Sequence, residues 1–182
     1  MWSQPFVNIL DACPDLYART VVLNGVSKAY AMTGWRIGYA GGPAPLISAM
    51  KTIQSQSTSN PCAIAQKAAV AALNGGQESV EMMVRAFKER HDFLVHRLQD
   101  MPGVEVIPAD GTFYLFPNVQ PIIERLGFAN DLAFSAKLLE EVGIALVPGS
   151  AFGNEGCIRL SFATSMDILE DAMNRFQRFV KQ

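Results

Sequence analysis

Two cations stand close together in a stretch that is otherwise made of small, aromatic and hydroxyl residues. Lys28 and Arg36 lie in segment 24–39, NGVSKAYAMTGWRIGY. Lysines almost never stay buried unless they are paired, so one interpretation is a lysine with its amine at the surface. The other is a reactive amine, because a lysine becomes a nucleophile where neighbouring charge or desolvation favours loss of its proton. Side-chain chemistry alone favours the surface lysine, whereas the neighbouring residues favour the reactive one.

A third cation, Arg159, stands inside the apolar run from Cys157 to Phe162. A charge in such a run is costly unless it is paired. An ion pair with an acid of a neighbouring helix is therefore one interpretation of Arg159.

Length and composition limit the classes of function. The chain has 182 residues, of which 49% are hydrophobic and 18% charged, with a net charge of −2. This composition is typical of one or two soluble globular domains. The sequence shows no basic surface for nucleic acid, no apolar run long enough to span a membrane and no signal peptide at its start. We therefore expect a cytoplasmic protein without nucleic-acid or membrane partners.

The metal-ligating residue types do not form a pattern. Cys13, Cys62 and Cys157 are odd in number and far apart, which fits neither a disulfide framework nor a zinc site and suggests a reducing compartment. His91 and His96 are five residues apart, so they do not share a helical face, and we expect a surface role for both. No metal is predicted.

The elements around Lys28 are predicted from apolar spacing and turn residues. Strands are expected at 20–24 and 36–40, with the lysine stretch as the loop between them, followed by helices at 44–56 and 62–73. A long helix over 77–101 follows the break at Asn74-Gly75-Gly76. It is a candidate bridge between two domains.

The rest of the chain predicts an α+β unit. Strands are expected at 104–107, 112–116, 144–147 and 157–162, and helices at 130–142 and 165–180. Thr164 and Asp167 have the spacing of a capping box for the last helix.

Two domains follow from this order, at residues 1–75 and 76–182. The first offers only two strands, and an isolated strand pair is marginal in water. We therefore expect its helices to need a larger sheet, supplied from the N-terminal side or by another chain.

Segment 27–36, SKAYAMTGWR, resembles the cofactor-lysine motif of the class I/II aminotransferases, which are fold-type I pyridoxal-phosphate enzymes, and most of all their aspartate-aminotransferase-like branch. The resemblance continues through the segments IGYAGGP, QSTSNP, GTFY, VPG and IRLSFA in the family's order. It implies an α/β protein: the C-terminal part of the three-layer αβα large domain, followed by a complete small α+β domain.

The resemblance implies roles for the three cations. Lys28 is implied as the catalytic lysine that holds pyridoxal 5'-phosphate covalently and moves a proton. Arg36 is implied to grip the cofactor phosphate, and Arg159 to receive the substrate α-carboxylate. Many relatives place a phosphate-binding serine three residues before the lysine. Here that position is Gly25, and Ser27 is the cofactor-binding candidate beside the lysine.

Four further positions carry weaker implications. Ser59 and Asn60 match a loop that approaches the partner subunit's cofactor, although a plain turn before a proline explains them equally well. Phe113 is implied on the substrate side, with core packing as the alternative. Some dicarboxylate-specific relatives carry an arginine where this chain has the neutral Ser55.

The implied activity is transfer of an amino group between an amino acid and a 2-oxo acid, in amino-acid metabolism, by a homodimer. The family's aspartate at the pyridine nitrogen, its ring-stacking aromatic and its phosphate turn would precede Met1. We therefore expect negligible transamination by these residues alone. Two alternatives stay open: an inactive truncated or degenerate protein stabilised by self-association, and a pyridoxal-phosphate lyase on the same fold.

Overall fold

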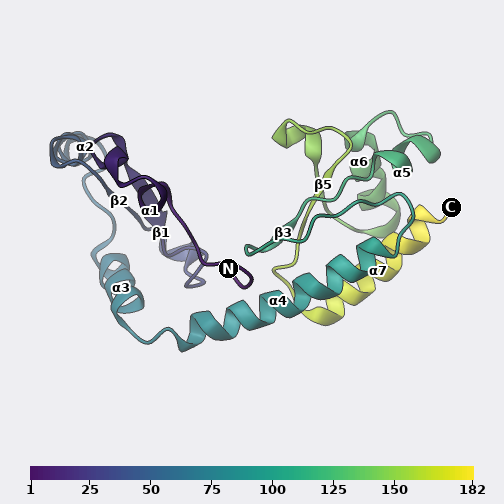
Figure 1. Ribbon diagram of the computed structural model, residues 1–182, viewed down its shortest axis with the longest axis horizontal. Coiled ribbons are helices and arrows are strands. Elements are labelled where there is room, and N and C mark those ends of the chain that lie inside the picture. The colour runs from purple at the N-terminus through teal and green to yellow at the C-terminus, as the bar shows by residue number, and fades with distance from the viewer. The chain divides into compact units, whose positions relative to one another are not determined.

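The computed structural model describes residues 1–182 as two compact units (Figure 1). The N-terminal unit comprises Pro5–Met83. The C-terminal unit comprises Val84–Gln182 together with the first residues, Met1–Gln4. The division falls within a long helix, whereas the sequence placed a domain boundary between residues 75 and 76.

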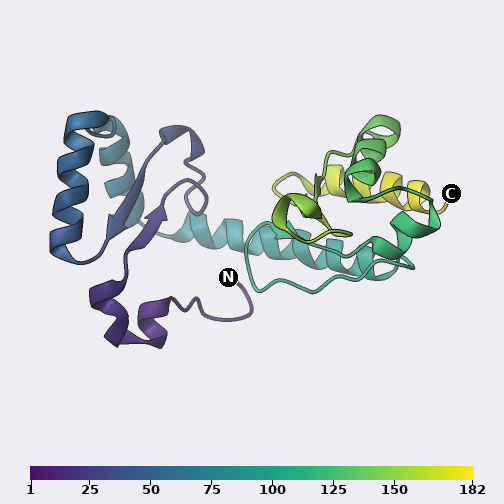
Figure 2. The ribbon, with the colours of Figure 1, turned by 90° about the horizontal axis from the view of Figure 1, so that it is seen from above.

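The N-terminal unit begins with short helices and one strand pair, which Figure 2 shows in purple and blue. Its elements, in chain order, are α1 (Ile9–Ala12), the 3₁₀ helix η1 (Pro14–Arg19), β1 (Val22–Gly25), the 3₁₀ helix η2 (Thr33–Trp35), β2 (Gly38–Gly41), α2 (Ala44–Ser57) and α3 (Ala63–Asn74). The helix α4 (Glu78–Gln99) starts in this unit and continues into the other. The two strands and three long helices lie within a few residues of the predicted ranges.

Strands β1 and β2 are antiparallel and close the loop that carries Lys28. Val22 pairs with Gly41 at one end of the ladder, and Gly25 pairs with Gly38 at the loop end. A Cβ atom on Gly38 would lie 3.0 Å from the Asn24 carbonyl oxygen, which is closer than side chains usually come. The glycine therefore allows the two strands to approach where the loop begins.

The C-terminal unit packs helices against a small sheet. Its remaining elements are β3 (Tyr114–Leu115), α5 (Gln120–Arg125), α6 (Asp131–Val142), β4 (Val147–Pro148), the 3₁₀ helix η3 (Gly149–Phe152), β5 (Ile158–Ser161) and α7 (Met166–Val180). The antiparallel sheet has the order β3-β5-β4, so β5 is central. Helix α7 runs beside α4 (Figure 1), and Arg97 donates to the Asn174 side chain between them at 2.9 Å.

The large core belongs to the C-terminal unit. Its buried members come from four helices, the sheet and the turns between them: Leu94, Val95, Leu98, Met101, Val104, Leu115, Val119, Ile122, Ile123, Phe134, Leu138, Ile144, Ile158, Leu160, Phe162, Leu169, Met173, Phe176, Phe179 and Val180. Rings dominate one end, where Phe134 contacts Phe176 and Phe179 edge-on. Burial of large aromatic side chains of this kind is a main source of folding free energy.

Three predicted strands of this unit are wrong or shorter than expected. Residues 104–107 form no strand, because only Glu105 pairs, in an isolated bridge with Asn118, and the following Pro108 has no N–H to donate. The strand at 112–116 shrinks to β3, since Thr112 adopts a positive φ of 75° that ends an extended run. The strand at 144–147 is displaced to β4.

The predicted capping box of the last helix is also wrong. Ser165 is the N-cap of α7 and its side chain makes no capping bond. A capping box forms instead at α1, where the Asn8 side chain accepts from the Asp11 backbone and the Asp11 side chain accepts from Asn8.

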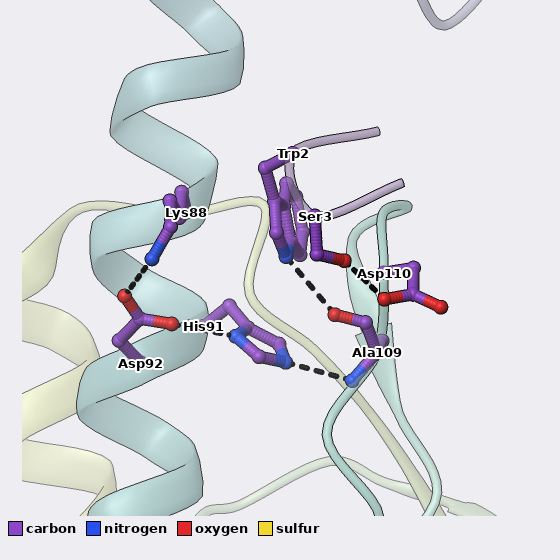
Figure 3. A network of polar contacts seen from close by, with 7 residues as sticks. All are labelled: Trp2, Ser3, Lys88, His91, Asp92, Ala109 and Asp110. Carbon is purple, nitrogen blue, oxygen red and sulfur yellow. Dashed lines mark hydrogen bonds and ion pairs between the residues drawn. The ribbon is translucent and has the colours of Figure 1, made fainter. Parts of the chain in front are cut away.

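The surface role predicted for His91 is wrong, because the ring is buried, with 3% of the residue exposed. Its Nε2 accepts from the Ala109 backbone N–H at 2.9 Å, so Nδ1 carries the proton and donates to Asp92 at 3.0 Å (Figure 3). Trp2 packs on the imidazole with ring centroids 5.1 Å apart and donates to the Ala109 carbonyl at 2.9 Å. These bonds fasten the segment Met1–Gln4 to the C-terminal unit. His96 is exposed, as expected.

The structure contains neither a candidate membrane-spanning helix nor a candidate metal site. None of the helices combines the length and the apolar character that crossing a bilayer requires. No three His, Cys, Asp or Glu side chains gather in a group that could hold a metal ion.

Candidate functional site

The Lys28 loop, residues 26–37, is compact. Tyr30 N–H donates to the Val26 carbonyl at 3.3 Å, and Ala31 N–H donates to the Lys28 carbonyl at 3.1 Å, so the chain turns on either side of the lysine. Ala31 has a φ of 52°, a left-handed conformation that non-glycine residues rarely adopt. Lys28 itself is exposed, and Ser27 beside it is half-buried.

A small core anchors this loop on α3. Val26 is fully buried and Met32 is 9% exposed, and both pack with the buried Ala69 of α3. Small side chains on α3 allow this close packing, as the alanine-rich sequence of that helix predicts. This packing fixes the loop on either side of Lys28. The core that anchors it contains only three buried residues.

One side-chain hydrogen bond adds to this anchor. The Tyr30 hydroxyl lies 3.1 Å from Oε1 of Gln77, in the turn between α3 and α4. The Gln77 amide donates in turn to the Ala72 and Gly75 carbonyls, at 3.2 and 2.9 Å. Gln77 therefore links the Lys28 loop to the C-terminal end of α3, a link that residue spacing could not have indicated.

Arg36 stands at the other end of the loop, just after η2, where its backbone is left-handed with a φ of 52°. Nη1 donates to the Thr33 carbonyl at 3.0 Å, which holds the exposed guanidinium against its own turn. A guanidinium has five N–H donors in a planar fork, so most of its donors stay available to an anion. Lys28, Ser27 and Arg36 thus lie on one closed loop.

Ser59 and Asn60 lie in the exposed turn between α2 and α3. Ser59 has a φ of 63°, and its N–H donates to the Gln54 carbonyl at 2.9 Å. The Asn60 amide donates to the Pro61 carbonyl at 3.2 Å. These local bonds agree with a turn before a proline, and the role of both residues near a cofactor stays a prediction. Ser55 bonds within α2, to the Thr52 carbonyl.

Arg159 lies on β5, the central strand of the C-terminal sheet, and is half-buried. It takes part in none of the chain's ion pairs, so the predicted pairing with a helix acid is absent. Its guanidinium carbon instead lies 4.5 Å from the Tyr114 ring centroid and 4.6 Å from that of Phe152. The arginine is held by rings and has no acid of this chain against it.

The aromatic rings of Phe113 and Tyr114 contact each other, with centroids 4.2 Å apart. Phe113 also lies 6.3 Å from Phe87 and packs against the large core, while Tyr114 also contacts Arg159. Phe113 was the predicted substrate-side residue, and this assignment stays a prediction. The sequence does not indicate a role for Phe152. The one local feature that could have drawn attention to it is its position shortly after Pro148-Gly149.

The donor set of the Lys28 loop fits the polar ends of pyridoxal phosphate. An amine and a guanidinium on one loop suit an aldehyde and a phosphate, respectively, and the Ser27 hydroxyl can add a hydrogen bond. Glycines also bound the loop. A Cβ atom on Gly25 would lie only 3.3 Å from the Ile37 carbonyl oxygen, so the backbone leaves little room for a side chain there. These residues can therefore hold the aldehyde and phosphate ends of the cofactor.

Comparisons with known proteins point to one family. Residues 3–176 match the family model described as aminotransferase class I and II. The chain is 58% identical over 176 residues to an aspartate/prephenate aminotransferase of Nitrosomonas europaea, covering 93% of this chain and 44% of that protein. It is 49% identical over 175 residues to an aspartate aminotransferase of Geobacillus stearothermophilus, covering 96% of this chain and 44% of that protein.

Solved structures show the same relationship. The aspartate aminotransferase of Rhizobium meliloti aligns with a TM-score of 0.89 and 41% identity, over 97% of this chain and 45% of that one. The aspartate aminotransferase of Thermotoga maritima aligns with a TM-score of 0.86 and 42% identity, over 97% of this chain and 44% of that one.

These matches confirm the predicted α/β fold class and the resemblance to the aspartate-aminotransferase-like branch. The chain spans less than half the length of the relatives it matches. By its sequence and its fold, the chain belongs to the class I and II aminotransferase family.

Proposed function

We propose that this chain provides the lysine and the carboxylate-binding part of a pyridoxal-phosphate-dependent aminotransferase, which moves an amino group between an amino acid and a 2-oxo acid. The observation that carries the proposal is the closed loop between β1 and β2, which presents the amine of Lys28 and the guanidinium of Arg36 within a family match over residues 3–176. The bound cofactor would supply an electron sink for the substrate α-carbon.

The chain's own residues would do three things in that reaction. The Lys28 amine would bind the cofactor aldehyde and, once released, would take the proton from the substrate α-carbon and deliver it to the former aldehyde carbon of the cofactor. Arg36 would hold the phosphate, where its permanent charge and planar fork suit an anion with several oxygens. Arg159 would bind the substrate carboxylate in the same way, since no acid of the chain competes for it.

The narrower features belong to the proposal as well. The Nitrosomonas europaea relative is described as an aspartate/prephenate aminotransferase, so aspartate and prephenate are the first amino-group donor and acceptor to test. A homodimer is supported by the family resemblance of the Ser59–Asn60 turn. A cytoplasmic location is supported by three free cysteines, at Cys13, Cys62 and Cys157.

The phosphate role of Arg36 can be tested apart from turnover. Binding of pyridoxal 5'-phosphate is followed by its absorbance in the wild-type chain and in Arg36→Ala, with pyridoxal, which has no phosphate, as the matched ligand. Loss of a charge-assisted bidentate contact should weaken phosphate binding about tenfold or more. Pyridoxal should bind both proteins equally. Equal weakening of both ligands would contradict the assignment of Arg36 to the phosphate.

A further inference from the structure

The Arg159 guanidinium is covered by two rings from different elements. Tyr114 belongs to β3 and Phe152 to η3, and each ring centroid lies within 4.6 Å of the guanidinium carbon. An arginine over ring faces gains a cation–π attraction and keeps its N–H donors in its own plane. The two rings therefore decide which way the donors of Arg159 face.

The strand register explains the position of Tyr114. Tyr114 of β3 pairs directly with Ser161 of β5, and Arg159 is two residues from Ser161 along that strand. Side chains two residues apart point to the same face of a sheet, so Tyr114 and Arg159 are diagonal neighbours on one face. This contact is built into the sheet and does not depend on a loop.

Phe152 reaches Arg159 through a tight turn. Val147 of β4 pairs with Arg159, and η3 follows β4 directly. Gly149 begins η3 with its N–H donating to the Cys157 carbonyl at 2.7 Å, and a Cβ on Gly149 would lie 2.7 Å from Cys157 Cβ. Only a glycine allows this approach, which returns the chain to β5 within a few residues.

A buried carboxylate holds η3 from the other side. Asp131, the first residue of α6, is 1% exposed, and its Oδ2 accepts from the Ser150 backbone N–H at 2.6 Å. Its Oδ1 has no hydrogen-bond partner, and burial of such a group is costly. A carboxylate kept at this cost has a specific task here, which is to fix the turn that carries Phe152.

We propose that Tyr114 and Phe152 are positioning residues for Arg159, and that Asp131 supports Phe152 through Ser150. The rings fix the plane of the guanidinium, so that a carboxylate meets two N–H donors edge-on without first ordering a long side chain. The proposal rests on the proposed function, in which Arg159 binds the substrate carboxylate. It adds that the affinity of Arg159 for a carboxylate depends on Tyr114, Phe152 and Asp131 as well as on the arginine itself.

The test uses the full 182-residue chain with ¹⁵N-labelled arginine. Pyruvate, a 2-oxo acid with one carboxylate, is titrated while the Arg159 Nε–Hε resonance is followed by NMR, with uncharged methyl pyruvate as the control ligand. Phe152→Leu should remove one ring-current contribution from the Arg159 signal and weaken pyruvate binding by about three- to tenfold. Phe152→Tyr keeps a ring at this position, so the Arg159 signal and the affinity for pyruvate should stay close to those of the wild type.

A matched variant separates this effect from general loss of an aromatic ring. Arg97 lies over Phe93 with its guanidinium carbon 5.7 Å from the centroid, so Phe93→Leu removes a similar contact elsewhere and should leave pyruvate binding unchanged. Asp131→Asn should shift the Arg159 signal in the same direction as Phe152→Leu, by a smaller amount. If a Phe152 variant does not fold, Tyr114→Leu provides the same test from β3.

The outcomes distinguish two failures. If pyruvate does not perturb Arg159 in the wild-type chain, the proposed carboxylate role fails and the positioning role fails with it. If pyruvate binds to the wild-type chain and to Phe152→Leu and Tyr114→Leu with equal affinity, only the positioning role is overturned.

Discussion

The two units hold the three candidate cations of the site in different ways. Lys28 and Arg36 stand exposed on a loop that is anchored by a core of Val26, Met32 and Ala69. Arg159 stands on the central strand of a sheet that packs on a core of twenty buried side chains. The amine proposed to hold the cofactor is thus carried by a lightly held segment, whereas the arginine proposed to bind the carboxylate is fixed by the fold itself.

The same contrast holds for the helices. Helix α2 contains no buried residue, and its apolar stripe is open to solvent at Leu46, Met50 and Ile53. In α7 the corresponding stripe is buried, with Leu169, Met173, Phe176 and Phe179 at most 5% exposed. An apolar stripe in a sequence therefore shows that a helix can bury one face, and says nothing of whether a partner is present.

The largest difference between the units should appear in core truncations. Phe134→Ala removes a fully buried ring of the C-terminal unit and should lower the free energy of unfolding by about 3–5 kcal/mol. Ile53→Ala, at a residue 70% exposed on α2, should change it by less than about 0.5 kcal/mol. Urea unfolding followed by circular dichroism measures both, and equal losses would contradict the contrast between the two units.

Loosening the Lys28 loop should have an intermediate effect. Tyr30→Phe removes the hydrogen bond to Gln77 and should cost about 1 kcal/mol, or about a fivefold rise in local opening. Hydrogen exchange of the peptide that covers residues 26–37, read by mass spectrometry, measures this change. Tyr17→Phe, at an exposed tyrosine, is the control. Equal exchange in the wild type and Tyr30→Phe would show that Gln77 does not hold the loop.

Thiol reactivity should separate the units in a single experiment. Backbone N–H groups of Ala65 and, to a lesser extent, Ile64 lower the pKa of the exposed Cys62 thiol at the start of α3. Burial, with a smaller effect from the Asp131 charge, raises the pKa of the Cys157 thiol in the C-terminal unit. Iodoacetamide at neutral pH should alkylate Cys62 at least about tenfold faster than Cys157. Peptide mapping over time gives the two rates; faster labelling of Cys157 would refute this order.

The smallest expected effect is the pH dependence of the Asp92 contacts. Hydrogen bonds from Lys88, and then from His91, lower the pKa of the Asp92 carboxyl below its usual value of 3.8 (Figure 3). The stabilisation is therefore complete above pH 3.8 and is lost as the pH falls through the lower pKa of the folded state. Because Asp92 is exposed, Asp92→Asn should cost only about a few tenths of a kcal/mol at neutral pH. Melting curves should show this cost shrinking as the pH falls below 3.8; a cost that stays constant there has another origin.

The parts of the fold that follow local rules could be predicted from the sequence. The helix α4 and the loop between β1 and β2 were expected from apolar spacing and glycine positions, which are local signals. The burial of His91 was missed because its partners, Ala109 and Trp2, are distant in the sequence.

The candidate site divides in the same way. The Lys28 motif was evident because its residues are neighbours in the chain. The contact of Phe152 with Arg159 depends on the register of β4 with β5 and on the turn at Gly149, and no local pattern indicates it. The length of a short strand such as β3, predicted over 112–116, also does not follow from local patterns, because its pairing is set by the partner strand.

We propose that the Lys28 loop selects one amine for the cofactor. Lys28 is one of six lysines in the chain, so the others serve as internal controls. The chain is incubated with pyridoxal 5'-phosphate, reduced with borohydride, digested and mapped by mass spectrometry, in parallel with Arg36→Ala. We predict that the label concentrates on Lys28 and that this preference is reduced in Arg36→Ala. Label distributed over the exposed lysines without preference for Lys28 would contradict the account.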